Sequence, residues 1–323
     1  MNPSVSSEIK NVHIKISHIE NQLSSQIKIE LIHDIQEVEK IWKYFNPEPQ
    51  NIYQDWNYIK VFYDAYKYTP YFYTAYENNI PVACLPLEWV PERNRLEMFG
   101  NMSYIHYVFS KDTYEHYLSL LIQSVKLPLF SESIVCNKKE YRDYFEEIDR
   151  NYILDIQNIS SGIEYLEKKF PWEGKSKFLQ QMRKIESIGI SIEVGKSEDL
   201  EWFFEMNKQN FWDTSAYHDK RRQENIRLLE KNTATQTYIR TFRFDGEIVA
   251  VYFFIKDSYN NTLYAINGAS QKEIANLGKF VILDFIDLGL SLWCDYVDLW
   301  STSFGYKQNW TTFTHPVYNF KKQ

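Results

Sequence analysis

The chain repeats one strand-turn-strand pattern at a spacing of 167 residues. Tyr73 to Ala83 aligns with Arg240 to Ala250 at this spacing, and each segment has the pattern of a β-hairpin. The turns are Asn78-Asn79 in the first copy and Asp245-Gly246 in the second. Asp-Gly is a strong hairpin signal because its turn needs positive φ angles, and Asn-Asn is a weaker form of the same signal.

The same spacing continues beyond the hairpins. Arg95 to Phe99 aligns with Thr262 to Ile266 as a third strand. Asp112 to Val125 then aligns with Lys279 to Leu292, and both segments have the apolar periodicity of a helix. A register without gaps over hairpin, strand and helix predicts two tandem copies of one α/β unit.

The second copy has further helix and strand signals. Ser197 to Asn210 is predicted as its early helix, with Ser197 as N-cap and Glu198-Asp199 at the positive end. Tyr296 to Trp300 is predicted as the strand after the later helix. A strand, a helix and a second strand imply a parallel pair, and a ligand cleft commonly opens at the carboxyl end of such a pair.

A basic segment connects the two copies. Trp172 to Ser187 is predicted as a helix that carries several Lys and Arg side chains, and Gly189 ends it. Ile190 to Val194 then begins the second sheet. This helix is either a solvated face or a docking surface for an acidic carrier protein or a nucleotide.

Length and composition limit the classes of protein. The 323 residues suit one large domain or two of ordinary size. With the repeat, we expect a flexible leader over 1–25 and lobes over 26–150 and 151–323. The net charge of −7 argues against DNA as a partner. Three widely spaced cysteines without CxxC spacing and the lack of an apolar run of about 20 residues predict a cytoplasmic protein without a membrane span.

Several stretches together resemble a known family. They are Tyr152 to Asp155, the Lys/Arg-bearing helix with Lys175, Lys177, Arg183 and Lys184, Gly278-Lys279 before an apolar helix, and Asp298-Leu299 followed by Gly305-Tyr306-Lys307 and Trp310. From about Lys28 to Phe320 the chain resembles the GCN5-related N-acetyltransferases (GNAT), in particular the two-lobed branch with Fem-type transferases and the BioF2-like domain. The resemblance implies an α/β fold of tandem GNAT-like lobes, each a mixed twisted sheet flanked by helices.

The second lobe is expected to hold an acyl donor. The resemblance implies backbone N–H groups near Gly268 and Ala269 for the acyl carbonyl, and an anion site at the start of the later helix. The loop Gln271 to Lys279 has a single glycine where acetyl-CoA enzymes of this type usually have a glycine-rich loop. The donor is therefore acyl-CoA, an acyl carrier protein thioester or an aminoacyl-tRNA. The donor-binding candidates are Gly268, Ala269, Asn276, Gly278, Lys279 and Lys307.

Four side chains are candidates for the chemistry. His106 follows the third strand of the first copy and is suited to deprotonate an amine, or it is a structural loop histidine. Asp213 is an acceptor-site carboxylate or an ordinary Asx turn. Asp298 stands in an apolar strand, where it faces the cleft or anchors Lys307 or a tyrosine. Tyr306 is the candidate acid for a leaving thiolate, as the resemblance implies.

These features predict an N-acyltransferase without a metal site. It is expected to move an acetyl to fatty acyl group from a thioester to an amine of a small molecule or peptide, with a longer chain favoured by the 17% aromatic content. The alternatives are a Fem-type transferase that uses aminoacyl-tRNA and a catalytically inactive GNAT-like binding module.

Overall fold

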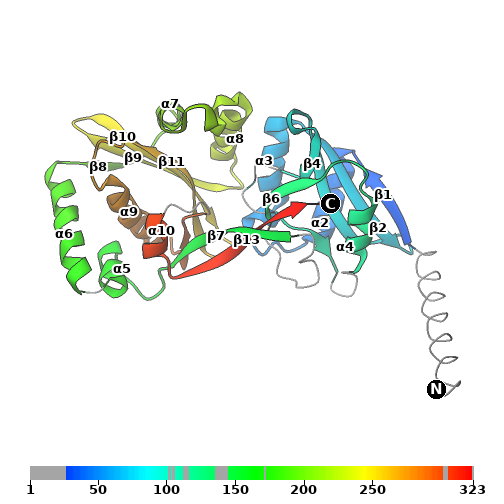
Figure 1. The fold of residues 1–323 in the computed structure, drawn as a ribbon, viewed down its shortest axis with the longest axis horizontal. Helices are drawn as coiled ribbons and strands as arrows, with labels where there is room; N and C mark the ends of the chain where they lie inside the picture. The colour runs from blue at the N-terminus through cyan, green and yellow to red at the C-terminus, as the bar shows by residue number, and fades with distance from the viewer. Residues whose placement is uncertain are drawn as a thin grey trace, which may run out of the picture.

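The protein forms two α/β lobes in a computed structural model, and both chain segments that link them are β-strands (Figure 1). The structure describes residues 27–321, apart from 101–102, 104–105, 112–115, 135–144, 171 and 301–304. The predicted leader and the first residues of the helix predicted from Asp112 lie outside the described residues. None of the helices in the described part of the chain has the length and apolar character that a membrane crossing requires.

The first lobe contains an antiparallel sheet in the order β1-β2-β3-β4, with β5 also paired to β3. Alternate side chains face opposite sides of its strands. Phe72 and Cys84 pack with the helices on one face, whereas Tyr73 and Leu85 pack with α4 on the other. The elements are β1 (Ile27–Ile32), α2 (Ile35–Phe45), η1 (Ile52–Gln54), α3 (Trp56–Tyr66), β2 (Thr69–Glu77), β3 (Ile80–Val90), η2 (Pro91–Arg93), β4 (Arg95–Met98), β5 (Phe109–Ser110) and α4 (His116–Ser124).

The second sheet has eight described strands in the order β6-β13-β7-β12-β11-β10-β9-β8. Only β11 and β12 pair in parallel, and the other neighbours are antiparallel. This confirms the predicted parallel pair. The strands are β6 (Phe130–Ile134), β7 (Phe145–Asp155), β8 (Ser191–Val194), β9 (Gln236–Phe244), β10 (Glu247–Asp257), β11 (Thr262–Ser270), β12 (Tyr296–Asp298) and β13 (Phe313–Lys321).

Helices cover both faces of the second sheet. Phe254 and Leu263 face the core with α5, α6 and α9, whereas Phe253 and Ile266 face the core with α7 and α8. The latter core continues without a break into the first lobe. The helices are α5 (Gly162–Lys169), α6 (Trp172–Ser187), α7 (Asp199–Phe211), η5 (Trp212–Thr214), η6 (Ala216–His218), α8 (Lys220–Lys231), α9 (Leu277–Ser291) and α10 (Gly305–Trp310).

The structure confirms the internal repeat. The hairpin β2–β3 and the hairpin β9–β10 have the same bounds at a spacing of 167 residues. All four turn residues have positive φ, from 50° at Asp245 to 82° at Gly246. Each hairpin also has a β-bulge at the same place, where Val82 and Val249 have no register partner. The shared bulge extends the repeat from sequence pattern to backbone geometry.

Two local predictions were wrong. Ser197 does not cap α7, because its hydroxyl donates to Glu230 (2.8 Å) and the helix begins two residues later. The carboxylate of Asp199 instead accepts the N–H of Lys196 (3.0 Å) and the Thr241 hydroxyl. The strand predicted over Tyr296 to Trp300 ends at Asp298, because Trp300 has a φ of 68°.

The lobes are joined by strands and by contacts between equivalent elements. β7 and β13 extend from the second sheet towards the first lobe, where β13 pairs with β6 and Phe320 enters the first lobe's core (Figure 1). Helix α3 of the first repeat contacts α8, its counterpart in the second. Arg221 on α8 also forms an ion pair with Glu92 on η2 (2.5 Å). These contacts fix one lobe against the other.

Asp257 makes a buried polar contact between the lobes. Its carboxylate accepts the N–H of Ile52 from the first lobe (2.8 Å) and that of Tyr259 from its own turn (2.9 Å). The side chain is fully buried, and burial raises its pKa to about 6. Backbone N–H donors, including that of Asn260, thus offset part of the cost of desolvating this carboxylate.

We expect Asp257→Ala to lower the free energy of unfolding by about 1–3 kcal/mol, because it leaves buried N–H groups without an acceptor. Asp257→Asn retains a carbonyl oxygen and should lose less. Urea denaturation followed by far-UV circular dichroism measures both. Equal losses for the two variants would contradict the role given to the hydrogen bonds.

Candidate functional site

The site is built where β11 and β12 separate. The two strands pair only from Thr262 to Tyr264 and from Tyr296 to Asp298. The N–H of Trp300 then donates to the Asp298 carboxylate (2.6 Å), which closes a tight turn. Leu299 donates its N–H to the carbonyl of Tyr152 on β7 (2.9 Å), while β11 continues to Ser270 with a β-bulge at Ile266. The chain after β12 therefore leaves β11 with one edge unpaired.

A cavity of about 690 Å³ lies along this unpaired edge. We call it the apolar cavity because most of its wall consists of aliphatic and aromatic side chains from β11, α7, α9 and the segment after β12. Its lining residues are Asn207, Asn210, Phe211, Tyr252, Ala265, Ile266, Asn267, Gly268, Ala269, Ser270, Lys272, Ile282, Phe285, Leu299, Trp300 and Lys307. Three of the predicted donor-binding residues, Gly268, Ala269 and Lys307, are among them.

The backbone of β11 presents hydrogen-bonding groups to the apolar cavity. Gln271 donates its N–H to Val249 on the β10 side (2.9 Å). Because backbone groups alternate in direction along a strand, those of Gly268 and Ser270 face the unpaired edge. Asn210 indeed donates to the carbonyl of Ser270 from that side (3.0 Å). Of the two predicted carbonyl-binding residues, Gly268 rather than Ala269 thus directs its N–H to the cavity.

Gly268 is also required by packing. A Cβ atom at this position would lie 1.8 Å from Cδ1 of Tyr252, its register partner on β10. The Tyr252 ring is held from its other side by Phe285, with ring centroids 4.9 Å apart. The aromatic ring therefore lies across the glycine and forms part of the cavity wall.

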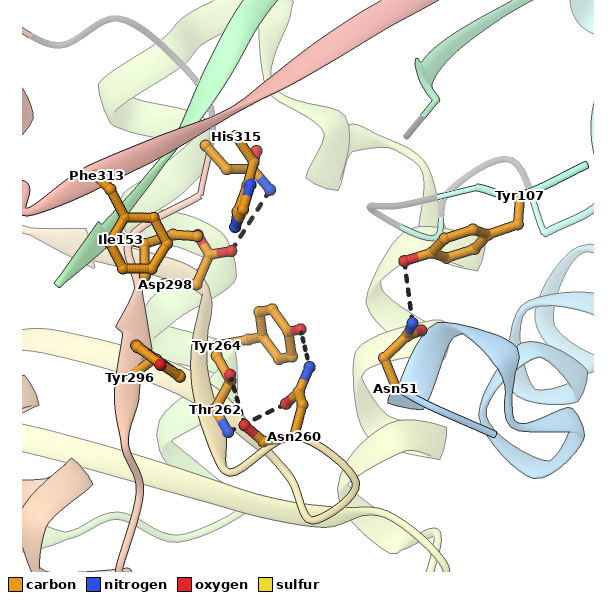
Figure 2. A pocket seen from close by; sticks show the side chains of 11 residues that line it. Asn51, Tyr107, Ile153, Asn260, Thr262, Tyr264, Tyr296, Asp298, Phe313 and His315 are labelled. Carbon is orange, nitrogen blue, oxygen red and sulfur yellow. Dashed lines mark hydrogen bonds between the residues drawn. The ribbon is translucent and has the colours of Figure 1, made fainter. Parts of the chain in front are cut away.

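A second cavity, of about 480 Å³, adjoins the first between the lobes. We call it the Asp298 cavity. Figure 2 shows Asp298, Tyr264 and His315 on one side of it and Tyr107 with Asn51 on the other. Asp298 lines this cavity, and the next two residues, Leu299 and Trp300, line the apolar one. The full lining is Asn51, Tyr107, Asn151, Ile153, Asn260, Thr262, Tyr264, Tyr296, Asp298, Phe313 and His315.

The carboxyl group of Asp298 has a raised pKa. It is 3% exposed, and burial raises its pKa to about 7. The N–H of Trp300, the charge of Lys307 and the amide of Asn151 (3.5 Å) oppose this rise. A carboxyl group that is partly ionised at neutral pH is suited to accept and release a proton.

Lys307 occupies the other side of this segment, on α10. Its ammonium donates to the carbonyl of Leu299 (2.7 Å) and more weakly to that of Trp300 (3.5 Å). Burial lowers its pKa to about 8, against the attraction of Asp298 and Asp149. Lys307 and Asp298 therefore form an electrostatically coupled pair, one group lining each cavity.

The predicted anion site at the start of α9 lies outside both linings. Helix α9 begins at Leu277, after Asn276 with a φ of 67°. Gly278 is exposed and has no atom within 4 Å of the position of a Cβ. Lys279 donates to Gln181 on α6 (2.7 Å). Of the predicted donor-binding residues, the apolar cavity thus includes Gly268, Ala269 and Lys307 in its lining but not Asn276, Gly278 or Lys279.

The other predicted side chains lie in three different places. His106 is buried (4% exposed), but it lines neither cavity, whereas its neighbour Tyr107 lines the Asp298 cavity. Asp213 is exposed on η5, outside both linings. Tyr306 belongs to α10, and its side chain lies outside the described residues. Of the four catalytic candidates, Asp298 alone has a described side chain in a cavity wall.

Several residues of the Asp298 cavity were missed. Asn151 is 2% exposed, but in the sequence it follows Asp149 and Arg150, so no apolar surroundings marked it as a buried polar residue. His315 faces the cavity because β13 pairs with β7, in the register His315 to Asn151. Partial burial lowers the pKa of this histidine. The pairing of β13 with β7 has no local signal in the sequence.

Two glycine replacements test the packing of the apolar cavity. We expect Gly268→Ala to lower the free energy of unfolding by about 1–3 kcal/mol, because the new methyl group overlaps Tyr252. Gly278→Ala is the matched control and should raise stability by up to about 1 kcal/mol, because the helix has free space there. Chemical denaturation distinguishes them, and similar effects of the two changes would contradict the packing.

The pKa of Asp298 gives a pH-dependent stability. Because its pKa is raised from 3.8 to about 7 in the folded chain, ionisation costs folding free energy as the pH rises through this window. Asp298→Asn cannot ionise, so its stability relative to the wild type should increase from pH 4 to pH 7, by at most about 1.4 kcal/mol per pH unit. Denaturant midpoints across this range measure the difference, and a constant difference would contradict the raised pKa.

Comparisons with known proteins identify the fold. No protein-family model matches the sequence, and no curated protein matches it significantly. Among solved structures, L-PGS from Bacillus licheniformis has a TM-score of 0.56 at 11% identity and covers 88% of this chain and 91% of its own. FemX has a TM-score of 0.57 at 11% identity, with coverage of 91% and 97%.

A third similar structure is of a protein described as a tandem GNAT. A tandem GNAT protein from the clavulanic acid biosynthesis pathway has a TM-score of 0.53 at 10% identity and covers 91% of this chain and 98% of its own. Nearly complete coverage in both directions means that both lobes and their connection are shared. This confirms the resemblance inferred from the sequence at the level of fold. The chain therefore adopts the two-lobed, tandem GNAT fold that it shares with these three structures.

Proposed function

We propose that the protein is an N-acyltransferase that binds a thioester donor in the apolar cavity and an amine in the Asp298 cavity. The observation that carries this proposal is that consecutive residues of one turn line the two cavities, Asp298 the Asp298 cavity and Leu299 and Trp300 the apolar cavity. A donor and an acceptor in these cavities are brought together at the point where β11 and β12 separate.

The apolar cavity suits an acyl thioester. Ile282, Phe285 and Leu299 offer apolar surface to an acyl chain, whose burial is favourable at about 25 cal/mol per Å². The N–H of Gly268 on the unpaired edge is directed to hydrogen-bond the thioester carbonyl and to stabilise the oxyanion that forms from it. The donor is acyl-CoA or an acyl carrier protein thioester, with a chain from acetyl to fatty acyl.

Asp298 and Lys307 account for the proton transfers. Ionised Asp298 takes a proton from the ammonium of the acceptor, and the nitrogen lone pair attacks the thioester carbonyl. The C–N bond forms, Asp298, which has passed the first proton to solvent, takes the second proton from the nitrogen, and the C–S bond then breaks, which gives an amide and a thiolate. The thiolate takes a proton from Lys307, whose pKa of about 8 is close to that of a thiol, and Tyr306 beside it is the second candidate for this step.

The reaction is tested by mass spectrometry with acyl-CoAs from acetyl to palmitoyl and a panel of amines. We expect amide formation, and a loss of 100-fold or more in rate for Asp298→Asn, which is the usual size of a general-base contribution of about 10²–10⁴. Asp295→Asn, just before the same strand and outside both cavities, is the control. Transfer from a charged tRNA but from none of the thioesters would instead establish the Fem-type alternative. No transfer from any donor would leave the inactive binding module.

The position of the acyl chain gives a second test. Ala265 lines the apolar cavity beside the aliphatic core of α9, so Ala265→Leu should fill part of the space for the chain. We expect kcat/KM to fall several-fold for long acyl donors and to change little for acetyl, with the KM of the amine unchanged. Equal losses for all donors would contradict this placement of the chain.

A further inference from the structure

The side chains that line the Asp298 cavity are more acidic than basic. Among the described residues, its lining includes a carboxylate, four amide or hydroxyl side chains and three tyrosines, but no Lys or Arg. Its one histidine, His315, has a pKa that partial burial lowers, which favours the neutral ring. The carboxylate of Asp257 lies behind Tyr107 and Tyr264 and adds negative potential. The cavity therefore favours a cation over an anion.

The polar groups next to Asp298 have hydrogen-bonding capacity left. Asn151 is 2% exposed and donates its amide to Asp298, but its Oδ1 atom has no hydrogen-bond partner. An ammonium ion has three N–H donors and no acceptor, so it complements a carboxylate beside an amide oxygen. The opposing group, Lys307, lies on the side of the apolar cavity and leaves the face of Asp298 towards Asn151 for a ligand.

The remaining wall is aromatic. The rings of Tyr264, Tyr296 and Phe313 line the same cavity, and Phe313 packs edge-on against both Tyr296 and His315. Aromatic rings attract a cation through their faces and offer apolar surface to its stem. A ligand with an α-carboxylate would bring an acid next to Asp298, where the described part of the lining provides no Lys or Arg to neutralise it.

We infer that the Asp298 cavity selects a primary ammonium ion on an aromatic or alkyl stem without an acidic group beside the nitrogen. The inference rests on the proposed function, because it specifies the acceptor of that reaction. Small arylalkyl or alkyl amines meet this description, and so does the side chain of a lysine within a peptide. Free α-amino acids do not.

Binding can be measured without any donor. Isothermal titration calorimetry at pH 8 compares phenethylamine, hexylamine and Nα-acetyl-lysine amide with the neutral phenethyl alcohol and with phenylalanine. We expect at least one of the three amines to bind, and to bind about tenfold or more tightly than the alcohol and the amino acid, as the loss of a charge-assisted hydrogen bond implies. The tightest amine tells whether the acceptor is a small molecule or a peptide lysine.

Two variants locate the binding. Asp298→Asn retains an oxygen for the Trp300 N–H and should weaken the amine by tenfold or more, whereas Asp295→Asn should leave its affinity unchanged. Melting temperatures confirm that both variants fold. Binding of none of the amines, equal binding of the alcohol, or undiminished binding by Asp298→Asn would overturn the inference.

The acylation assay separates this inference from the proposed function. Selective amine binding that depends on Asp298, without transfer from any donor, would retain the inference and remove the proposed reaction. Transfer to free amino acids as readily as to simple amines would retain the reaction and overturn the inference.

Discussion

The hydrogen bond from the Trp300 N–H to the Asp298 carboxylate shapes the site. It closes a turn at the end of β12, with Trp300 in the left-handed region at a φ of 68°. A non-glycine residue adopts this conformation only where its surroundings compensate the cost. Because the chain turns here towards Tyr152 on β7, β11 keeps an unpaired edge. The apolar cavity lies along this unpaired edge, and Asp298 at the start of the turn lines the second cavity.

The same turn explains why a carboxyl group is buried at the centre of the molecule. Asp298 is held by one backbone donor and by the amide of Asn151, and its desolvation raises its pKa to about 7. A neutral residue would fold at lower cost at pH 7, but it would have no proton to exchange. Burial also disfavours the charged form of Lys307 and lowers its pKa to about 8. Burying the charged forms of Asp298 and Lys307 therefore lowers the stability of the fold at the place where the proposed reaction needs ionisable groups.

Much of the fold could be predicted because the repeat has local signals. The turns at Asn78-Asn79 and Asp245-Gly246 need positive φ angles, which their residue types signal. The spacing of 167 residues between the turns then aligned the neighbouring strands and helices of the two copies. The exception at Ser197 has a tertiary cause, because its hydroxyl donates to Glu230 on α8 instead of capping α7. The end of β12 was less predictable from the sequence, because the chain there follows β7 through the hydrogen bond from Leu299 to Tyr152, which is a tertiary contact.

The candidate site was predictable only in part. Asp298 stood out as a polar residue in an apolar strand, and Gly268 followed from the resemblance to the GNAT family. His315 and Asn151 meet through the pairing of β13 with β7, which joins residues far apart in the sequence. His106 follows β4 closely, but Tyr107 next to it lines the cavity. A shift by one residue reverses the direction of a side chain, and tertiary contacts decide that direction.

The most direct measurement is a crystal structure with a non-hydrolysable thioether analogue of an acylated pantetheine, the part that CoA and carrier-protein donors share. The account predicts that the acyl carbonyl lies about 3 Å from the N–H of Gly268, with the chain against Ile282 and Phe285. Binding of the analogue away from the unpaired edge of β11, or in the Asp298 cavity, would contradict the assignment of the two cavities.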